Sequence, residues 1–97
     1  MAGILRSSVN ARAALKPAAA IEVVVQGPGV RLLAADSPLS EAITQVQDLG
    51  VEIFACGNSM RSIGLDAEVL TVGIGTVSAA VAHLAERQWE GWAYVRP

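Results

Sequence analysis

The chain is best approached from its middle, Gly50-Val-Glu-Ile-Phe-Ala-Cys-Gly-Asn-Ser-Met-Arg-Ser-Ile-Gly-Leu65. Val51 to Ala55 is a short, mostly apolar run between turn residues, which is typical of a buried strand in a parallel sheet. The only cysteine, Cys56, follows this run, and Ser59 to Ile63 has the pattern of a first helical turn. The strongest nucleophile of the chain is therefore predicted at the carboxyl end of a strand, where open α/β sheets bind ligands.

Two features of this stretch could lower the pKa of the Cys56 thiol. A helix start offers unpaired N–H groups and partial positive charge, and Arg61 is close enough in sequence to add a full charge. A thiol with a pKa of about 8.5 is only slightly ionised at neutral pH, whereas a pKa of about 7 leaves roughly half of it as the reactive thiolate. The alternative is that Cys56 is simply a buried, small hydrophobic residue, as unpaired cysteines often are.

The polar neighbours of Cys56 also have two interpretations. Asn58 and Ser59 could present polar groups to a sulfur adduct on Cys56, or they could cap the following helix. Arg61 is either a stabiliser of the thiolate or a solvated surface charge.

Helices and strands alternate along the rest of the chain. Ile21 to Val25 is a β-branched run broken only by Glu22, which predicts a buried strand, and it ends in the turn Gln26-Gly-Pro-Gly29. Ser37-Pro38 is a favourable helix start, and Gly50 is a helix stop. The expected helices cover 3–16, 38–49, 59–63 and 77–89, with Thr76 as the cap of the last one, and the expected strands cover 21–25, 51–55, 70–72 and 92–95.

This alternation predicts an α/β fold in three layers, α/β/α, in which a mostly parallel sheet is covered by helices on both faces. A length of 97 residues corresponds to a single domain over 1–97. The last helix is expected to bury Val77, Ala80, Val81 and Leu84.

The composition favours an oligomer. Hydrophobic residues make up 53% of the chain and aromatic residues only 4%, so the core is aliphatic and some apolar surface is expected between subunits. Trp89, Trp92 and Tyr94 suit such a contact, because their rings are amphipathic. We therefore expect a homo-oligomer, either a dimer or a trimer.

Charge and cysteine content exclude several classes of protein. A net charge of −2 gives no basic face for nucleic acid, and no stretch reaches the roughly 20 apolar residues of a membrane span. One cysteine forms no internal disulfide, which fits a cytoplasmic location. The acid-poor start, 1–20, superficially resembles a transit peptide, but an amphipathic helix with Leu5, Val9 and Ala13 on one stripe is the preferred interpretation.

Two further motifs were considered for cofactors. His83 has no second histidine or cysteine at ligand spacing, so a metal site is not predicted, and a surface or interface position is expected for it. Gly73-Ile-Gly75 lacks the third glycine of a dinucleotide-binding fingerprint. No metal or organic cofactor is therefore expected.

Four stretches together resemble the DsrE/DsrF-like family, small α/β proteins that include TusD-type sulfur-relay subunits. They are Val23-Val-Val-Gln-Gly-Pro-Gly-Val30, Gly50-Val-Glu-Ile-Phe-Ala-Cys-Gly-Asn-Ser-Met60, Gly75-Thr-Val77 and Glu86-Arg-Gln-Trp-Glu-Gly-Trp-Ala-Tyr-Val-Arg-Pro97. The resemblance implies a flavodoxin-like topology. In sulfur-relay members a cysteine after the equivalent strand carries a persulfide, and Cys56 occupies that position.

The chain departs from this family pattern in two places. Gln26 stands where relatives commonly have histidine, which removes a possible acid–base partner. Relatives also begin with a central strand ahead of the first helix, and this chain starts at the helix. We therefore expect either a truncated start or a sheet without the family's first strand, in which strands 21–25 and 51–55 pair directly or leave a gap.

These observations lead to two functional hypotheses. In the first, Cys56 takes sulfane sulfur as a persulfide and passes it to a thiol on a partner, with a sulfur donor or acceptor protein as that partner. The residues expected to bind the substrate are Gln26, Gly27, Gly57, Asn58, Ser59 and Arg61. In the second, the chain is a non-catalytic oligomeric module that binds a small ligand or a protein, with Cys56 as packing and Gln26 as a recognition residue. Whether there is catalytic turnover stays open.

Overall fold

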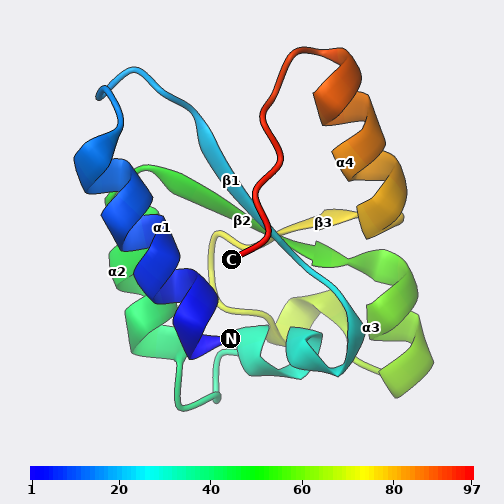
Figure 1. The fold of residues 1–97 in the computed structure, drawn as a ribbon. Coiled ribbons are helices and arrows are strands. Elements are labelled where there is room, and N and C mark those ends of the chain that lie inside the picture. Colours follow the sequence, from blue (N-terminus) through cyan, green and yellow to red (C-terminus); the bar gives the residue numbers. More distant parts are fainter.

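Three parallel strands form the centre of the computed structural model, which describes residues 1–97. They are β1 (Ile21–Val25), β2 (Val51–Cys56) and β3 (Gly75–Val77), in the spatial order β1-β2-β3 (Figure 1). The β1–β2 register runs from Ile21 beside Val51 to Val25 beside Ala55, and the β2–β3 register ends with Cys56 beside Val77. The first two strands therefore pair directly, which is one of the two arrangements expected from the sequence.

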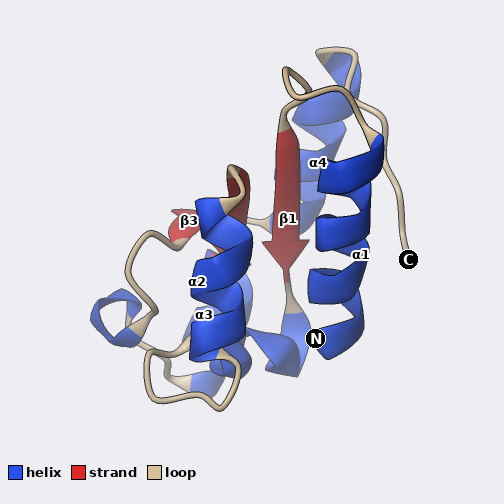
Figure 2. Ribbon diagram, turned by 90° about the vertical axis from the view of Figure 1, so that its left-hand side faces the viewer, coloured by secondary structure: helices blue, strands red, loops and turns tan.

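Helices lie on both sides of this sheet, as expected for a three-layer α/β/α fold. Helices α1 (Ala2–Ala14) and α2 (Ser40–Asp48) lie on one side, and α4 (Ala80–Trp89) lies on the other (Figures 1 and 2). The shorter helices η1 (Gly27–Leu33) and α3 (Gly57–Ile63) directly follow β1 and β2, and η2 (Ala67–Val69) lies in the connection to β3. The predicted α/β class is confirmed.

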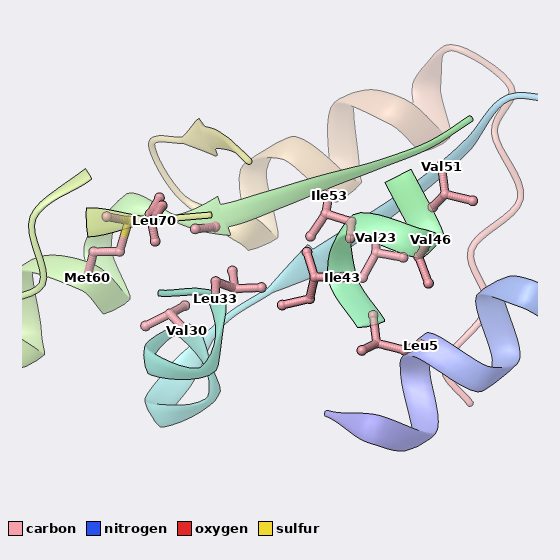
Figure 3. Close-up of a cluster of buried hydrophobic side chains, with 11 residues drawn as sticks. Leu5, Val23, Val30, Leu33, Ile43, Val46, Val51, Ile53, Met60 and Leu70 are labelled. Carbon is pink, nitrogen blue, oxygen red and sulfur yellow. The ribbon is translucent and has the colours of Figure 1, made fainter. Parts of the chain in front are cut away.

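The hydrophobic core fills the side of the sheet that α1 and α2 cover (Figure 3). Alternate residues of β2 point into it, because side chains of a strand alternate between the two faces. Four side chains are almost completely buried, Val30, Leu33, Ile43 and Ile53, and each contributes about 1.5–3 kcal/mol through burial. The other members of this cluster are Leu5, Val23, Val46, Val51, Ala55, Met60 and Leu70.

The opposite side of the sheet is covered less completely. Ala80, at 2% exposure, is the single buried residue of α4, whereas Val81 was expected to be buried and is 68% exposed. The expectation for Val81 was wrong because apolar spacing cannot show which face of a helix lies on the sheet.

The third strand differs from the prediction. Leu70 forms only an isolated antiparallel bridge with Ala34, and the strand lies at Gly75–Val77, where a loop was expected. A Cβ atom on Gly75 would lie 2.8 Å from Cδ1 of Phe54 on the neighbouring strand, so the absence of a side chain is what allows these strands to pair. Thr76 consequently belongs to a strand, and Ala79 is the N-cap of α4.

Other boundaries also shift. Helix α2 begins at Ser40, because Ser37 caps the preceding turn through its Oγ, which accepts the Leu39 N–H at 3.0 Å. The predicted strand at 92–95 is wrong, since residues 92–97 have no regular structure. Trp92 instead donates its backbone N–H to the Arg87 carbonyl at 2.9 Å, and its ring lies 4.9 Å from the Arg87 guanidinium carbon. None of the helices combines the length and the apolar character that crossing a membrane would require.

Candidate functional site

Cys56 is the last residue of β2 and the N-cap of α3, so the predicted strand-to-helix position is confirmed. Parallel pairing brings the ends of all three strands to the same edge of the sheet, with Val25 beside Ala55 and Val77 beside Cys56. The segment after β1 and the connection from β3 to α4 therefore both lie near the cysteine. The site is built by three chain segments that are far apart in the sequence.

The Cys56 residue is only 4% exposed, so its sulfur does not stand open at the rim of the sheet, and in this respect it matches the alternative of a buried cysteine. Burial follows from its position between β3 and α4, because the backbone N–H of Ala80 donates to Sγ at 3.4 Å. The sulfur is nevertheless not enclosed by aliphatic groups alone. The Ser59 hydroxyl and the backbone N–H groups of Ser59 and Asn58 are further polar groups that act on its pKa.

These contacts act on the thiol in opposite directions. Burial raises the pKa of Cys56, because a thiolate loses its hydration there. The hydrogen bonds from the Ser59 hydroxyl and from the backbone of Ser59, Ala80 and Asn58 lower it, because they stabilise the anion. The hydrogen bonds outweigh the burial, so the pKa of Cys56 lies below the ordinary value for a cysteine.

Ser59 connects this sulfur to the end of β1. The backbone N–H of Gly27 donates to Ser59 Oγ at 2.8 Å, which occupies the hydroxyl oxygen as an acceptor and leaves its proton for Cys56. Gly27 has a φ of +71°, a backbone angle that side-chain-bearing residues rarely adopt. Gly27 thus holds in place the Ser59 hydroxyl that lowers the Cys56 pKa.

Gly57 allows the β3–α4 connection to lie directly against the start of α3. A Cβ atom at this position would be 3.0 Å from the Val77 carbonyl oxygen and 3.4 Å from that of Ser78. The Asn58 N–H donates to the same Ser78 oxygen at 3.2 Å. A glycine is therefore needed here for close packing, and the connection that it admits helps to cover Cys56.

Two of the predicted residues lie at the surface and do not contact the Cys56 sulfur. The Arg61 side chain is exposed and donates to the Asn58 side-chain oxygen, and Arg61 is not among the groups that hydrogen-bond the Cys56 sulfur. Gln26 is exposed at the start of η1. The structure thus brings together Gly27, Gly57, Asn58, Ser59 and Cys56, and it leaves Gln26 and Arg61 at the surface.

A charged cluster on the α4 side of the sheet was not found from the sequence. Glu22 Oε1 lies 2.9 Å from His83 Nε2, and Arg87 donates through Nε and NH2 to the two Glu22 oxygens, each at 2.9 Å. The His83 ring also packs on Phe54, with 5.3 Å between ring centroids. His83 is therefore held inside the protein, and the only sequence signal was the single acid in the β-branched run 21–25.

Burial of Glu22 raises its pKa, but hydrogen bonds from Arg87 and His83 and their positive charge outweigh this and leave the pKa below its ordinary value. The Glu22 side chain is 9% exposed. The carboxylate is thus a largely covered anion whose charge His83 and Arg87 of α4 balance. No three side chains of the His, Cys, Asp and Glu types lie close enough together to hold a metal ion.

A shallow apolar groove of about 420 Å³ between α1 and α2 lies apart from these residues. Its lining includes Leu5, Val9 and Leu49 and none of the predicted site residues.

Fold and site together define a small α/β protein with a hydrogen-bonded cysteine where the middle strand of a parallel sheet meets a helix. The chain belongs to the DsrE/DsrF-like family, whose sequence pattern it matches over residues 6–97. It is also similar to a solved structure, the protein of unknown function MTH1491 from Methanobacterium thermoautotrophicum, at 38% identity with a TM-score of 0.91. That match covers 97% of this chain and 84% of the other. No curated protein matches the chain. Membership of the family, which includes sulfur-relay subunits, points to a function of the sulfur-relay type.

Proposed function

We propose that this protein is a sulfur carrier in which Cys56 holds sulfane sulfur as a persulfide. The observation that carries the proposal is the hydrogen bond from the Ala80 N–H to the Cys56 sulfur at 3.4 Å, and the lowering of the Cys56 pKa by Ser59 and Asn58 supports it. A thiolate is the form of cysteine that reacts with sulfur donors, and these donors lower the pKa of the thiol.

The transfer consists of two displacements. The Cys56 thiolate attacks the outer sulfur of a donor persulfide R–S–SH, so that a new S–S bond forms on Cys56 while the donor S–S bond breaks and R–S⁻ leaves. A partner thiolate then attacks the outer sulfur on Cys56, which forms the partner's persulfide and returns Cys56 to the thiolate. One sulfur atom moves in each step, and no external oxidant or reductant is consumed.

The surroundings of Cys56 suit an anionic sulfur. The Ser59 hydroxyl is oriented by the Gly27 N–H, and the backbone donors are held by the packing of α3 against the β3–α4 connection. At 4% exposure, Cys56 must become more accessible for a donor or an acceptor protein to reach it, and residues 77–80 are the segment that has to shift.

Mass spectrometry tests the proposal directly. The protein is incubated with polysulfide, or with thiosulfate and a sulfurtransferase, and its intact mass is measured. We expect an adduct of about 32 Da, one sulfur atom, that is removed by dithiothreitol and is absent from Cys56→Ser. A protein that stays at its original mass under both conditions would count against a carrier.

The burial of Cys56 favours one other function, a non-catalytic module that binds a small ligand or protein at the same strand ends. In that case Cys56 is packing, and Cys56→Ala keeps the function. The pH dependence of alkylation by iodoacetamide separates the two: a midpoint near 8.5 favours the binding module, and a midpoint nearer 7 favours sulfur chemistry.

We further propose that the protein is cytoplasmic and works as a homo-oligomer. Its support is the exposed apolar surface at Val81, Trp89 and Val95, which are 68%, 83% and 75% exposed, because large apolar surfaces of this kind mark contacts between proteins. Light scattering at micromolar concentration should give the mass of a dimer or trimer, and a monomer mass would end the idea.

A further inference from the structure

We propose that Glu22, His83 and Arg87 form a clamp that positions the N-terminus of α4 against the Cys56 sulfur. Cys56 supplies the chemistry in the proposed function, and the clamp would act on it without touching it. The inference therefore deepens the proposed function, and it assigns positioning roles to three residues that sequence reasoning had not connected with the cysteine.

The first step of the argument is the shortness of the path from the clamp to the sulfur. Ala80 is the first residue of α4, and its backbone N–H donates to Cys56 Sγ at 3.4 Å. His83 lies one helical turn further on and contacts Glu22 at 2.9 Å. A helix of ten residues is stiff on this scale, so a tilt or slide of α4 moves the Ala80 N–H relative to the sulfur.

The second step is that little else holds α4 in place. Ala80 is its single buried residue, whereas burial of Val, Leu or Ile side chains is what normally fixes a helix on a sheet. The polar and aromatic contacts that fix the helix on the sheet are the pair of hydrogen bonds from Arg87 to Glu22, the contact between His83 and Glu22, and the packing of His83 on Phe54, beside the half-buried Leu84 and Ala85. A bidentate Arg–carboxylate pair fixes both the distance and the relative orientation of the two side chains.

The third step concerns the carboxylate itself. The Glu22 side chain is 9% exposed and Glu22 is the second residue of β1, paired with Glu52 of β2, so its position is set by the β1–β2 pairing and not by α4. If the α4 partners withdrew, a largely covered charge would be left without its partners, which is unfavourable. The sheet thus supplies a fixed anchor to which α4 is drawn.

The experiment measures the Cys56 pKa from the ultraviolet absorbance of the thiolate as a function of pH, with Cys56→Ser as the blank. Because the chain has one cysteine, the signal reports this residue alone. The groups that face the sulfur are the Ser59 hydroxyl and the N–H groups of Asn58, Ser59 and Ala80, none of which titrates near neutral pH. The variants are Glu22→Gln, which keeps the shape and removes the charge, and Glu52→Gln, the matched control at the exposed register neighbour of Glu22.

We expect Glu22→Gln to raise the Cys56 pKa by about one unit, a tenfold loss of thiolate below the pKa, and Glu52→Gln to leave it unchanged. Hydrogen exchange should show faster exchange of the Ala80 amide in Glu22→Gln while the amides of β2 stay protected. An unchanged Cys56 pKa in folded Glu22→Gln, or a change equal to that in Glu52→Gln, overturns the clamp.

Two milder variants keep the test valid if Glu22→Gln fails to fold. Arg87→Lys retains the charge but loses the bidentate geometry, and His83→Gln retains a hydrogen-bonding side chain. Each should raise the Cys56 pKa by less than Glu22→Gln would, and wild-type pKa values in both would overturn the clamp. None of these measurements uses a sulfur donor, so absence of the persulfide adduct would reject the proposed function and leave the clamp standing. A normal adduct together with unchanged Cys56 pKa values in the variants would support the proposed function and overturn the clamp.

Discussion

At the scale of single residues, Ser59 is the side chain that most directly sets the state of Cys56. It accepts the Gly27 N–H at 2.8 Å and lowers the Cys56 pKa, so it connects the end of β1 with the cysteine. A hydroxyl suits this place because it accepts and donates at the same time. An alanine would break both contacts, and a threonine would add a methyl group beside a buried thiol.

Ser59→Ala should therefore raise the Cys56 pKa, because the thiolate loses a donor while the burial that disfavours it remains. We expect a rise of about one unit, together with a loss of stability of about 1–2 kcal/mol from the unpaired Gly27 N–H. The pH profile of iodoacetamide alkylation measures the first effect, and urea unfolding measures the second. Ser62→Ala is the control, since Ser62 belongs to the same helix but donates only to the Asn58 carbonyl. Identical alkylation profiles for the two variants would contradict the role of Ser59.

Thr71 offers a second test at this scale. The residue is 7% exposed, and its hydroxyl is buried without a hydrogen-bond partner. Thr71→Val replaces that hydroxyl by a methyl group of similar size, so the cost of desolvating an unpaired polar group disappears. We expect the free energy of unfolding to rise by about 1 kcal/mol in urea titrations. A clear loss of stability would mean that the hydroxyl has a partner in solution.

At this scale, the sequence alone was enough to place Cys56 and most of its neighbours. Cys56, Gly57, Asn58 and Ser59 are consecutive, so a strand-to-helix junction was enough to place them together. The burial of the sulfur and its contact with Ala80, 24 positions away, depend on how α4 packs. No local pattern contains that information, and the same is true of the pairing of Glu22 with His83 and Arg87.

At the scale of elements, β3 depends on the absence of a side chain. Gly75 lies beside Phe54 in the register, and a Cβ atom there would come within 2.8 Å of Cδ1 and 2.9 Å of Cε1 of the ring. The strand is only three residues long, so there is little else to hold it against β2. The ring of Phe54 thus occupies the space over a glycine, which is a known way for a sheet to tolerate that residue.

Gly75→Ala should consequently destabilise the protein by about 1–3 kcal/mol, because the Phe54 ring or the strand must move. The matched control is Gly3→Ala in α1, where a Cβ atom would meet nothing within 4 Å. That change should be neutral or stabilise by about 0.5 kcal/mol through lower chain entropy in the unfolded state. Urea unfolding of both variants provides the comparison, and equal stabilities would show that β3 accommodates a side chain freely.

The elements that were predicted correctly have strong local signals. The strands β1 and β2 and helix α2 have clear apolar patterns, and Pro17 and Gly50 mark helix ends. The expected stripe of α1 was wrong in part, because Leu5 is buried but Val9 and Ala13 are exposed. The two strand errors, 70–72 and 92–95, both came from short apolar runs. A run of that kind forms a strand only where a neighbouring strand offers free hydrogen-bonding groups, and the sequence does not show where that is. Conversely, Gly75–Val77 has such a neighbour and forms a strand despite its glycine.

At the scale of the whole molecule, the two sides of the sheet are stabilised by different forces. The α1–α2 side contains the aliphatic cluster with Ile43 and Ile53, whereas the α4 side depends on the buried Glu22 carboxylate and its partners. Alternation of helices and strands was enough to predict the layered architecture. The same alternation could not predict that an apolar cluster stabilises one side and a carboxylate the other, because a glutamate in a strand pattern usually marks an exposed face.

Because Glu22 is held by α4, the free energy of unfolding should fall as the pH is lowered. The pKa of Glu22 is lower in the folded protein than its ordinary value, so folding favours the charged form. The stabilising contribution is fully present above the ordinary value of about 4.3, and it is lost as the pH falls through the lower folded-state pKa, because the unfolded chain then binds the proton more readily. The groups that face this carboxylate are His83 and Arg87 from α4.

Urea unfolding between pH 7 and the acid limit of the folded state tests this directly. The difference in unfolding free energy between wild type and Glu22→Gln should be largest at neutral pH and should shrink as the pH falls below about 4.3. Glu52→Gln, which removes an exposed charge from the adjacent strand, should give a curve nearly parallel to that of wild type. If the curve for Glu22→Gln also ran parallel to that of wild type throughout this range, α4 would not bind the Glu22 carboxylate more tightly than water does. In that case Ala80 and the contact of His83 with Phe54 would have to hold α4 on the sheet.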